Sequence, residues 1–178
     1  INIWQNDISQ VEIVHKMASM LSLFSCHRRE YRQVICSKTA SNISVLIQAI
    51  AHFGSNLHAH ELIPSILSSL TCVLCTLALE DDVKHRIGIE YNGIPVLLGI
   101  LHSCPEGCDE NHVDIQYHIL ECLYRLIVPA ISSSPATSSV LDTIYKNKLA
   151  IFMHSKFIGL LDCIHASSFY TEGSIKCN

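Results

Sequence analysis

Apolar residues recur every three or four positions along most of this chain, which is the spacing expected of α-helices. No stretch of five or more residues alternates apolar and polar positions between turn residues, so the pattern predicts no β-strands. Short polar, glycine- or proline-containing segments separate the predicted helices, which run about 8–26, 30–38, 42–53, 60–79, 82–91, 94–103, 112–129, 138–153 and 156–166. The predicted fold class is therefore all-α.

Three of these helices are strongly apolar and have matching patterns. The segment 43–51 aligns with 94–102, which lies 51 residues later, and 94–102 aligns with 157–165, which lies a further 63 residues along. Each is preceded by a longer apolar helix and then a short, more polar one. Because no such unit can bury its apolar face alone, successive units must pack on one another. The sequence thus predicts three helical repeats at about 8–53, 60–103 and 112–166, followed by a polar tail at 167–178.

The middle unit carries a family resemblance. Residues 72–98 combine a leucine-rich helix, the acidic turn Glu80-Asp81-Asp82, a short charged stretch and Gly93-Ile94-Pro95 at the start of the next helix. This order resembles an armadillo repeat. The flanking units have Asn42-Ile43-Ser44 and Lys156-Phe157-Ile158 in place of Gly-Ile-Pro, and the third has a Ser- and Pro-rich insertion near 130–139. The resemblance covers roughly 8–166 and implies a right-handed α-solenoid of about three armadillo- or HEAT-like repeats.

The resemblance also implies where a ligand binds. In armadillo-like proteins the third helices lie side by side, and their outward positions form a concave strip. The equivalent positions here are Ser44, Gln48 and His52; Pro95, Gly99 and Ser103; and Ile158, Asp162 and Ala166. His52, His102 and His165 end the three apolar helices. One interpretation is that the three histidines line a shared surface. The other is that they lie at helix C-termini because the helix dipole favours histidine at that end.

The strip is nearly neutral, which predicts that it binds a peptide or helical segment of another protein rather than a basic peptide. The nuclear-transport members of the family grip basic peptides with a ladder of Asn and Trp, and Trp4 is the only tryptophan here. A nuclear-transport-type peptide receptor is the alternative function, and the neutral strip argues against it. An exposed repeat end further predicts self-association, or a partner that covers that end.

Composition narrows the function classes. The 178 residues are 49% hydrophobic and 16% charged with a net charge of −4, which predicts one domain in which most helix surface is packed. The net charge of −4 and only twelve Lys and Arg, of which the longest basic cluster is His27-Arg28-Arg29, argue against nucleic-acid binding. The uncharged segment 62–79 is short, has acidic ends and is diluted by Ser and Thr, so it predicts a buried helix and no membrane span.

Most of the nine cysteines lie in apolar helical stretches, which indicates small buried residues in a reducing cytoplasmic or nuclear compartment. The pair Cys72 and Cys75 is interpreted in the same way, as core packing. Cys104, Cys108 and His112 have a spacing that suits zinc but lack a clear fourth ligand. The alternatives are a zinc-binding regulatory helical domain and a polar loop between repeats.

Enzyme chemistry is not predicted. The sequence has no nucleophile with a nearby base, no paired carboxylates and no glycine-rich phosphate loop at usable spacing. We therefore expect a non-catalytic scaffold without a cofactor. The first residues, Ile1 to Trp4, include no methionine and no signal sequence, so the chain is expected to be a fragment of a longer protein.

Overall fold

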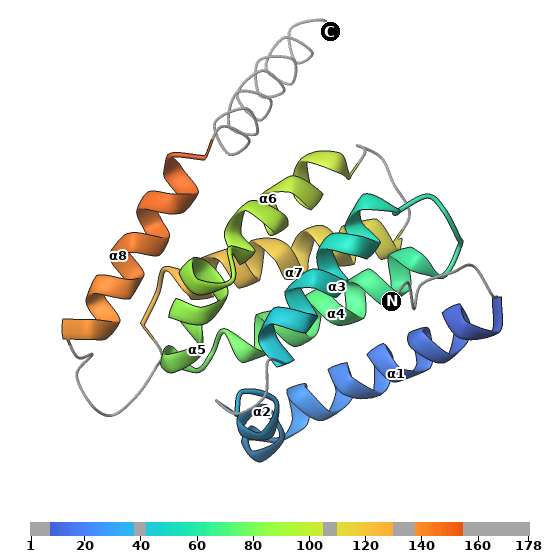
Figure 1. Cartoon of the computed structure of the whole chain (residues 1–178), viewed down its shortest axis with the longest axis horizontal. Coiled ribbons are helices and arrows are strands. Elements are labelled where there is room, and N and C mark those ends of the chain that lie inside the picture. Colours follow the sequence, from blue (N-terminus) through green and yellow to red (C-terminus); the bar gives the residue numbers. More distant parts are fainter. Residues whose placement is uncertain (1–7, 38–41, 105–109, 130–137, 155–178) are drawn as a thin grey trace, which may run out of the picture.

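The computed structural model describes residues 8–37, 42–104, 110–129 and 138–154 of the chain (Figure 1). These residues form helices and turns and contain no β-strand, which confirms the predicted all-α class. The elements are α1 (Ile8–His27), α2 (Arg29–Ile35), α3 (Asn42–Ser55), α4 (Ile63–Leu77), α5 (Asp81–His85), the π-helical turn η1 (Arg86–Glu90), α6 (Gly93–Ser103), α7 (Glu110–Leu126) and α8 (Ser138–Phe152).

The predicted helix positions are correct for all described elements, but several predicted ends are wrong. The helix expected at 30–38 ends at Ile35, where the backbone N–H of Cys36 closes the last turn on the carbonyl of Arg32. The helix expected at 60–79 begins at Ile63 because the ring of His60 accepts the Leu62 N–H in a turn. The helix expected at 82–91 is divided into α5 and η1. The predicted helix 156–166 and tail 167–178 lie outside the described residues.

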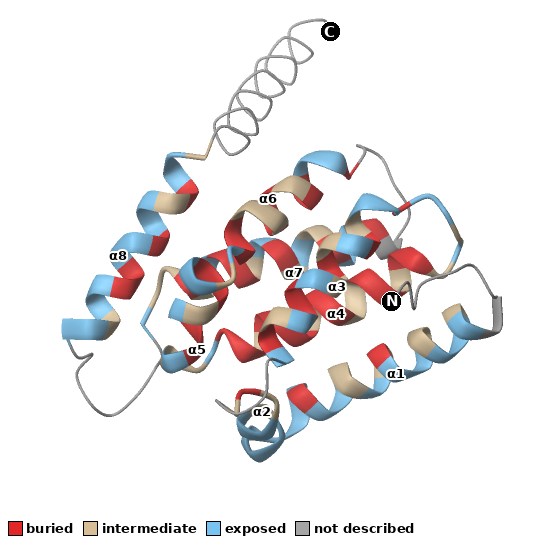
Figure 2. Cartoon of the chain, in the orientation of Figure 1, coloured by how far each residue is buried: buried red, intermediate tan, exposed pale blue. Residues whose placement is uncertain are grey.

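Helix α4 is the centre of the described fold. It packs against α1 on one side, α7 on another and α3 on a third (Figure 1). Most of its residues are buried, whereas α1 and α8 are buried along one side only (Figure 2). The segment without charges that the sequence assigned to a buried helix is therefore the element with the most extensive packing contacts. Among the described helices, none is both long and apolar enough to cross a membrane.

The apolar helices α3 and α6 pack against each other, and α6 also contacts α7 and α8. Their burial patterns agree at the 51-residue separation found in the sequence. The buried pairs at this separation are Ile43 and Ile94, Leu46 and Leu97, Ile47 and Leu98, and Ile50 and Leu101. Asn92 precedes α6 with a φ of 56°, a left-handed conformation that asparagine tolerates better than most residues.

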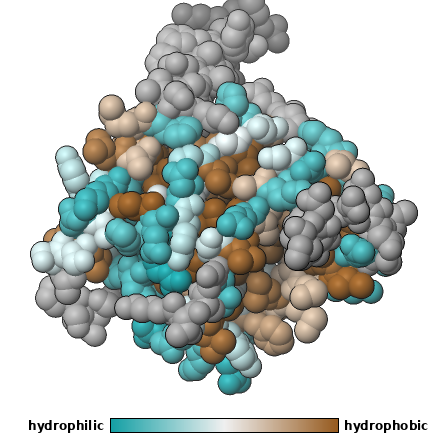
Figure 3. Space-filling model, viewed as in Figure 1, coloured by the Kyte–Doolittle hydropathy of each residue, from teal (hydrophilic) through white to brown (hydrophobic). Residues whose placement is uncertain are grey.

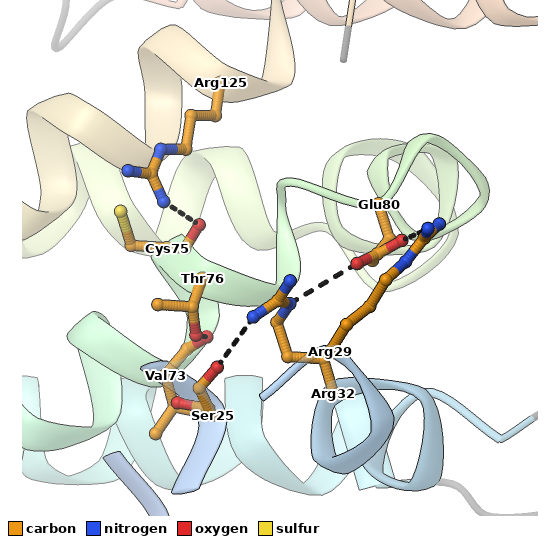
Figure 4. Close-up of polar contacts among 8 residues, drawn as sticks. All are labelled: Ser25, Arg29, Arg32, Val73, Cys75, Thr76, Glu80 and Arg125. Carbon is orange, nitrogen blue, oxygen red and sulfur yellow. Dashed lines mark hydrogen bonds and ion pairs between the residues drawn. The ribbon is translucent and has the colours of Figure 1, made fainter. Parts of the chain in front are cut away.

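Polar side chains from later helices complete the C-terminal ends of earlier ones. The last four carbonyls of α4 have no partner inside the helix, and three of them accept backbone N–H groups of Ala78, Leu79 and Glu80. The fourth, Cys75 O, accepts a hydrogen bond of 3.0 Å from the Arg125 guanidinium on α7 (Figure 4). Arg86 donates in the same way to Cys36 O, at 2.7 Å. Both bonds connect residues that are 50 positions apart in sequence.

Candidate functional site

A hollow of about 240 Å³ lies between α3 and α6, at the surface formed by the two matching apolar helices. Three lining residues belong to the last turns of α3, and the other five to one face of α6. The lining residues are Ala51, Gly54, Ser55, Pro95, Val96, Gly99, Ile100 and Ser103. Figure 3 shows the molecule from the same side as Figure 1, with hydrophobic surface between hydrophilic patches.

The hollow results from small side chains on two closely packed helices. A β-carbon on Gly54 would lie 2.5 Å from Cγ1 of Ile100, so the Ile100 side chain rests directly on the backbone of α3. Beside this contact, Ala51, Gly99 and Ser103 are too short to fill the space between the helices. The helices are thus held in close contact at one point and leave an open space next to it.

The lining contains no charged or aromatic side chain. The two serine hydroxyls donate to carbonyls of their own helices, Ser55 to Ala51 O and Ser103 to Gly99 O, each at 2.9 Å. Their oxygens keep lone pairs that can accept a hydrogen bond from a ligand. The hollow therefore suits an apolar group with a hydrogen-bond donor at its edge.

The structure brings together one third of the predicted strip. Pro95, Gly99 and Ser103 all line the hollow. Ser44 and Gln48 lie nearer the start of α3 and do not line it; Gln48 Nε2 donates to Ser44 Oγ at 3.3 Å. These two predicted strip residues of α3 therefore lie outside the lining of the hollow.

The predicted histidines do not line the hollow either. His52 is exposed in the last turns of α3, where its ring makes an edge contact with Phe53 at 5.4 Å between centroids. His102 is exposed near the end of α6. Ile158, Asp162, His165 and Ala166 lie outside the described residues, so the third part of the strip stays a prediction.

Sequence reasoning missed the α3 side of the hollow. It interpreted Gly54-Ser55 as the break after the helix, whereas both residues belong to the last turn of α3. The available signal was that Gly54 and Ser55 are small and lie three and four residues after the small Ala51, a spacing that places them beside Ala51 on one helix face. Val96 and Ile100 were interpreted only as apolar positions.

The zinc alternative is only partly covered by the described residues. Cys104 is buried at the end of α6 and His112 is buried in α7, but Cys108 lies outside the description. The His112 ring stacks with that of His58, with 6.3 Å between centroids. No three His, Cys, Asp or Glu side chains of the described ranges are grouped as a metal site. The candidate Cys104, Cys108 and His112 site therefore stays a prediction.

The titratable groups with shifted pKa values lie in the helix interfaces and not in the hollow. Burial raises the pKa of Cys36 to about 11 and that of Cys75 to about 12, and it also raises the pKa of Cys122. Burial lowers the pKa of His118. Each of these shifts favours the neutral form of the side chain, as expected for groups that are buried between packed helices.

No protein-family model, curated protein or solved structure matches this chain. We therefore argue its function from the hollow and from the helices that form it.

Proposed function

We propose that this chain is part of a right-handed, armadillo-like α-solenoid and that it acts without catalysis, by binding a peptide or helical segment of another protein. The proposed binding place is the hollow between α3 and α6. The observation that carries the proposal is the uncharged lining of small residues between two helices of matching sequence.

Three features of the described residues support the solenoid. The long helices α1, α4 and α7 pack in that order, and the apolar helices α3 and α6 pack beside them. The burial pattern of α3 is repeated in α6 at the separation found in the sequence. The bonds from Arg86 to Cys36 O and from Arg125 to Cys75 O connect adjacent units over the same distance along the chain. Regular contacts between neighbouring units are the basis of repeat-protein stability.

The size of the hollow favours a peptide over a small molecule. Pockets for small molecules usually enclose about 300–1,000 Å³ and bury most of the ligand. A space of about 240 Å³ accommodates one or two apolar side chains and leaves the backbone that carries them on the surface. Helices that bind in grooves use this arrangement, with a few apolar anchor residues on one face.

The chemistry of the lining favours an apolar anchor. A receptor for basic peptides would need carboxylates or the Asn and Trp ladder described above, and none of these side chains lines the hollow. Binding to the hollow should therefore depend little on salt concentration, because screening acts on charged partners. Salt dependence separates this proposal from the nuclear-transport alternative.

The proposal is tested by selecting peptides from a displayed random library with the full chain and measuring their affinity by fluorescence polarisation. The variant Gly99→Phe fills the hollow from α6. It should weaken binding of the selected peptides at least about tenfold, since apolar anchors in pockets contribute most of the binding free energy. Its thermal midpoint should stay within a few degrees of the original, because Gly99 is partly exposed and lines the open hollow.

A matched control places the same bulk on the predicted strip but outside the hollow. Gln48 is exposed on α3 and does not line the hollow, so Gln48→Phe should leave the peptide affinity unchanged. Selected peptides that bind equally well to Gly99→Phe, or that are basic and lose affinity as salt is raised, would show that the hollow is not the binding place.

A further inference from the structure

Two cysteines from neighbouring helices lie in contact. The Sγ atoms of Cys26, in the last turn of α1, and Cys72, in the middle of α4, are 3.7 Å apart although the residues are 46 positions apart in sequence. Cys26 is exposed and Cys72 is partly buried. A disulfide needs the two sulfur atoms at about 2.05 Å, so small side-chain rotations are enough to join this pair.

The other described cysteines differ from this pair. Cys36, Cys75, Cys104 and Cys122 are buried, so Cys26 is the exposed thiol among the described cysteines. Cys75, three residues further along α4, is buried in the core, where it lies near Cys122. Contact between sulfur atoms and access for an oxidant thus coincide at Cys26 and Cys72.

We propose that Cys26 and Cys72 form a reversible oxidation site at which a peroxide produces a disulfide between α1 and α4. The Cys26 thiolate attacks one oxygen of the peroxide; an S–O bond forms, the O–O bond breaks and hydroxide leaves as water after taking a proton. The Cys72 thiolate then attacks the Cys26 sulfur; the S–S bond forms, the S–O bond breaks and a second water leaves. Two thiols lose two electrons, and hydrogen peroxide is reduced to two waters.

The surroundings assign these two roles. The first step requires an accessible thiol, and Cys26 is the exposed one. Burial raises the pKa of Cys72, while a hydrogen bond with Ser22 acts in the opposite direction. Cys72 is therefore less accessible to the oxidant than Cys26 but close enough to attack the oxidised Cys26.

The disulfide would secure the end of the described stack. Helix α1 packs mainly against α4 and α2, and its opposite face is open to solvent. End helices with one packed face open more readily than the rest of a structure. A bond from the last turn of α1 to α4 holds this helix in place, and it should raise the midpoint of thermal unfolding by about 5 °C or more.

The experiment treats the full chain with hydrogen peroxide, alkylates the remaining thiols and maps the products by mass spectrometry. It is run on the original chain and on a chain with Cys108, Cys163 and Cys177 replaced by serine, so that only thiols with described positions remain. The expected result in both is a Cys26–Cys72 linked peptide, an intact mass lower by about 2 Da, and reversal by dithiothreitol. A Cys72–Cys75 link, or oxidation of Cys26 to sulfinic acid without a link, would overturn the proposal.

Single variants test each role. Cys26→Ser should abolish the link, and Cys72→Ser should leave a sulfenic acid on Cys26 that dimedone traps. Cys75→Ala is the control for the neighbouring thiol of α4, and it should form the link as the original chain does. Failure of dimedone to label Cys26 in the Cys72→Ser variant would contradict the order of the two steps.

Discussion

The side-chain amide oxygen of Asn147 occupies the space that a β-carbon on Gly88 would fill: the two atoms would be 2.1 Å apart. Asn147 lies on α8 and is completely buried. Its Nδ2 donates to Leu126 O at 3.0 Å and to Lys84 O at 3.4 Å. One amide thus connects α8 to the ends of α7 and α5, and it can reach them because Gly88 has no side chain.

We predict that Gly88→Ala destabilises the protein by about 2–3 kcal/mol, because the added methyl group must displace the Asn147 amide from its two carbonyl partners. The free energy of unfolding measured with urea tests this. If the clash is the cause, Gly88→Ala should cost much less in an Asn147→Ala background. The matched control is Gly99→Ala on α6, a partly exposed position beside the hollow, which should be neutral or stabilising by about 0.5–1 kcal/mol. Equal costs of Gly88→Ala in both backgrounds would contradict this explanation.

Arg125 provides the second prediction. Its guanidinium donates to Cys75 O at 3.0 Å and pairs with Glu121 at 2.8 Å. The Cys75 carbonyl is one of the four that α4 cannot satisfy itself. Arg125→Met keeps the aliphatic part of the side chain but removes the donor, and it should lower the free energy of unfolding by about 1.5–3 kcal/mol.

Glu121→Gln separates the two contacts of Arg125. The pair with Glu121 is partly exposed and should contribute about 0–1 kcal/mol. Urea unfolding of the two single variants therefore compares the carbonyl bond with the ion pair. A larger loss for Glu121→Gln than for Arg125→Met would show that the carbonyl bond is not the main contribution.

The helix positions could be predicted from the sequence because apolar spacing is a local signal. The π-helical turn η1 could not, because it depends on a neighbour distant in sequence. Its wide turn is closed by the Tyr91 N–H on Arg86 O at 2.9 Å, and Gly88 within it receives the amide of Asn147 from α8. A π-turn at this place is favoured by packing that only the folded chain provides.

The α6 side of the candidate site was predicted from the sequence, and the α3 side was missed. The repeat alignment placed Pro95, Gly99 and Ser103 on one exposed face, and all three line the hollow. On α3, Gly54 and Ser55 have the composition of a turn, so the local signal indicated a loop although packing against Ile100 keeps them helical. The contact between Cys26 and Cys72 could not be predicted, because it depends on how two units are placed on each other.

The third prediction concerns pH. Burial lowers the pKa of His118, an effect opposed by Asp114 and reinforced by Arg125. Because the unfolded chain takes up a proton near the ordinary value of 6.5, it binds more protons than the folded chain below that pH. Stability should therefore fall as pH drops through 6.5 toward the lower folded pKa. Urea midpoints between about pH 7.5 and 5.5 should fall less steeply in His118→Gln. Identical slopes for both proteins would contradict this prediction.

The fourth prediction concerns the exposed faces of α1 and α7. Helices α1 and α7 pack on different sides of α4, and each presents a row of exposed apolar residues to solvent. The rows have the same spacing, and they are Ile13, Met17, Met20 and Phe24 on α1, and Val113, Tyr117, Leu120 and Tyr124 on α7. We expect the chain to self-associate head to tail, with the α7 row of one copy on the α1 row of the next, because this repeats the order in which α1, α4 and α7 pack.

Two charged variants distinguish this arrangement from a symmetric one. Met17→Glu on α1 and Tyr117→Glu on α7 change side chains that are 64% and 61% exposed, so neither should reduce stability by more than about 0.5 kcal/mol. In a head-to-tail assembly each contact needs one row of each kind, so each variant alone should be monomeric by sedimentation velocity. An equal mixture should form dimers, because the intact α7 row of one variant meets the intact α1 row of the other. In a symmetric dimer only one row is used, so one variant would still dimerise by itself; that result would contradict head-to-tail association.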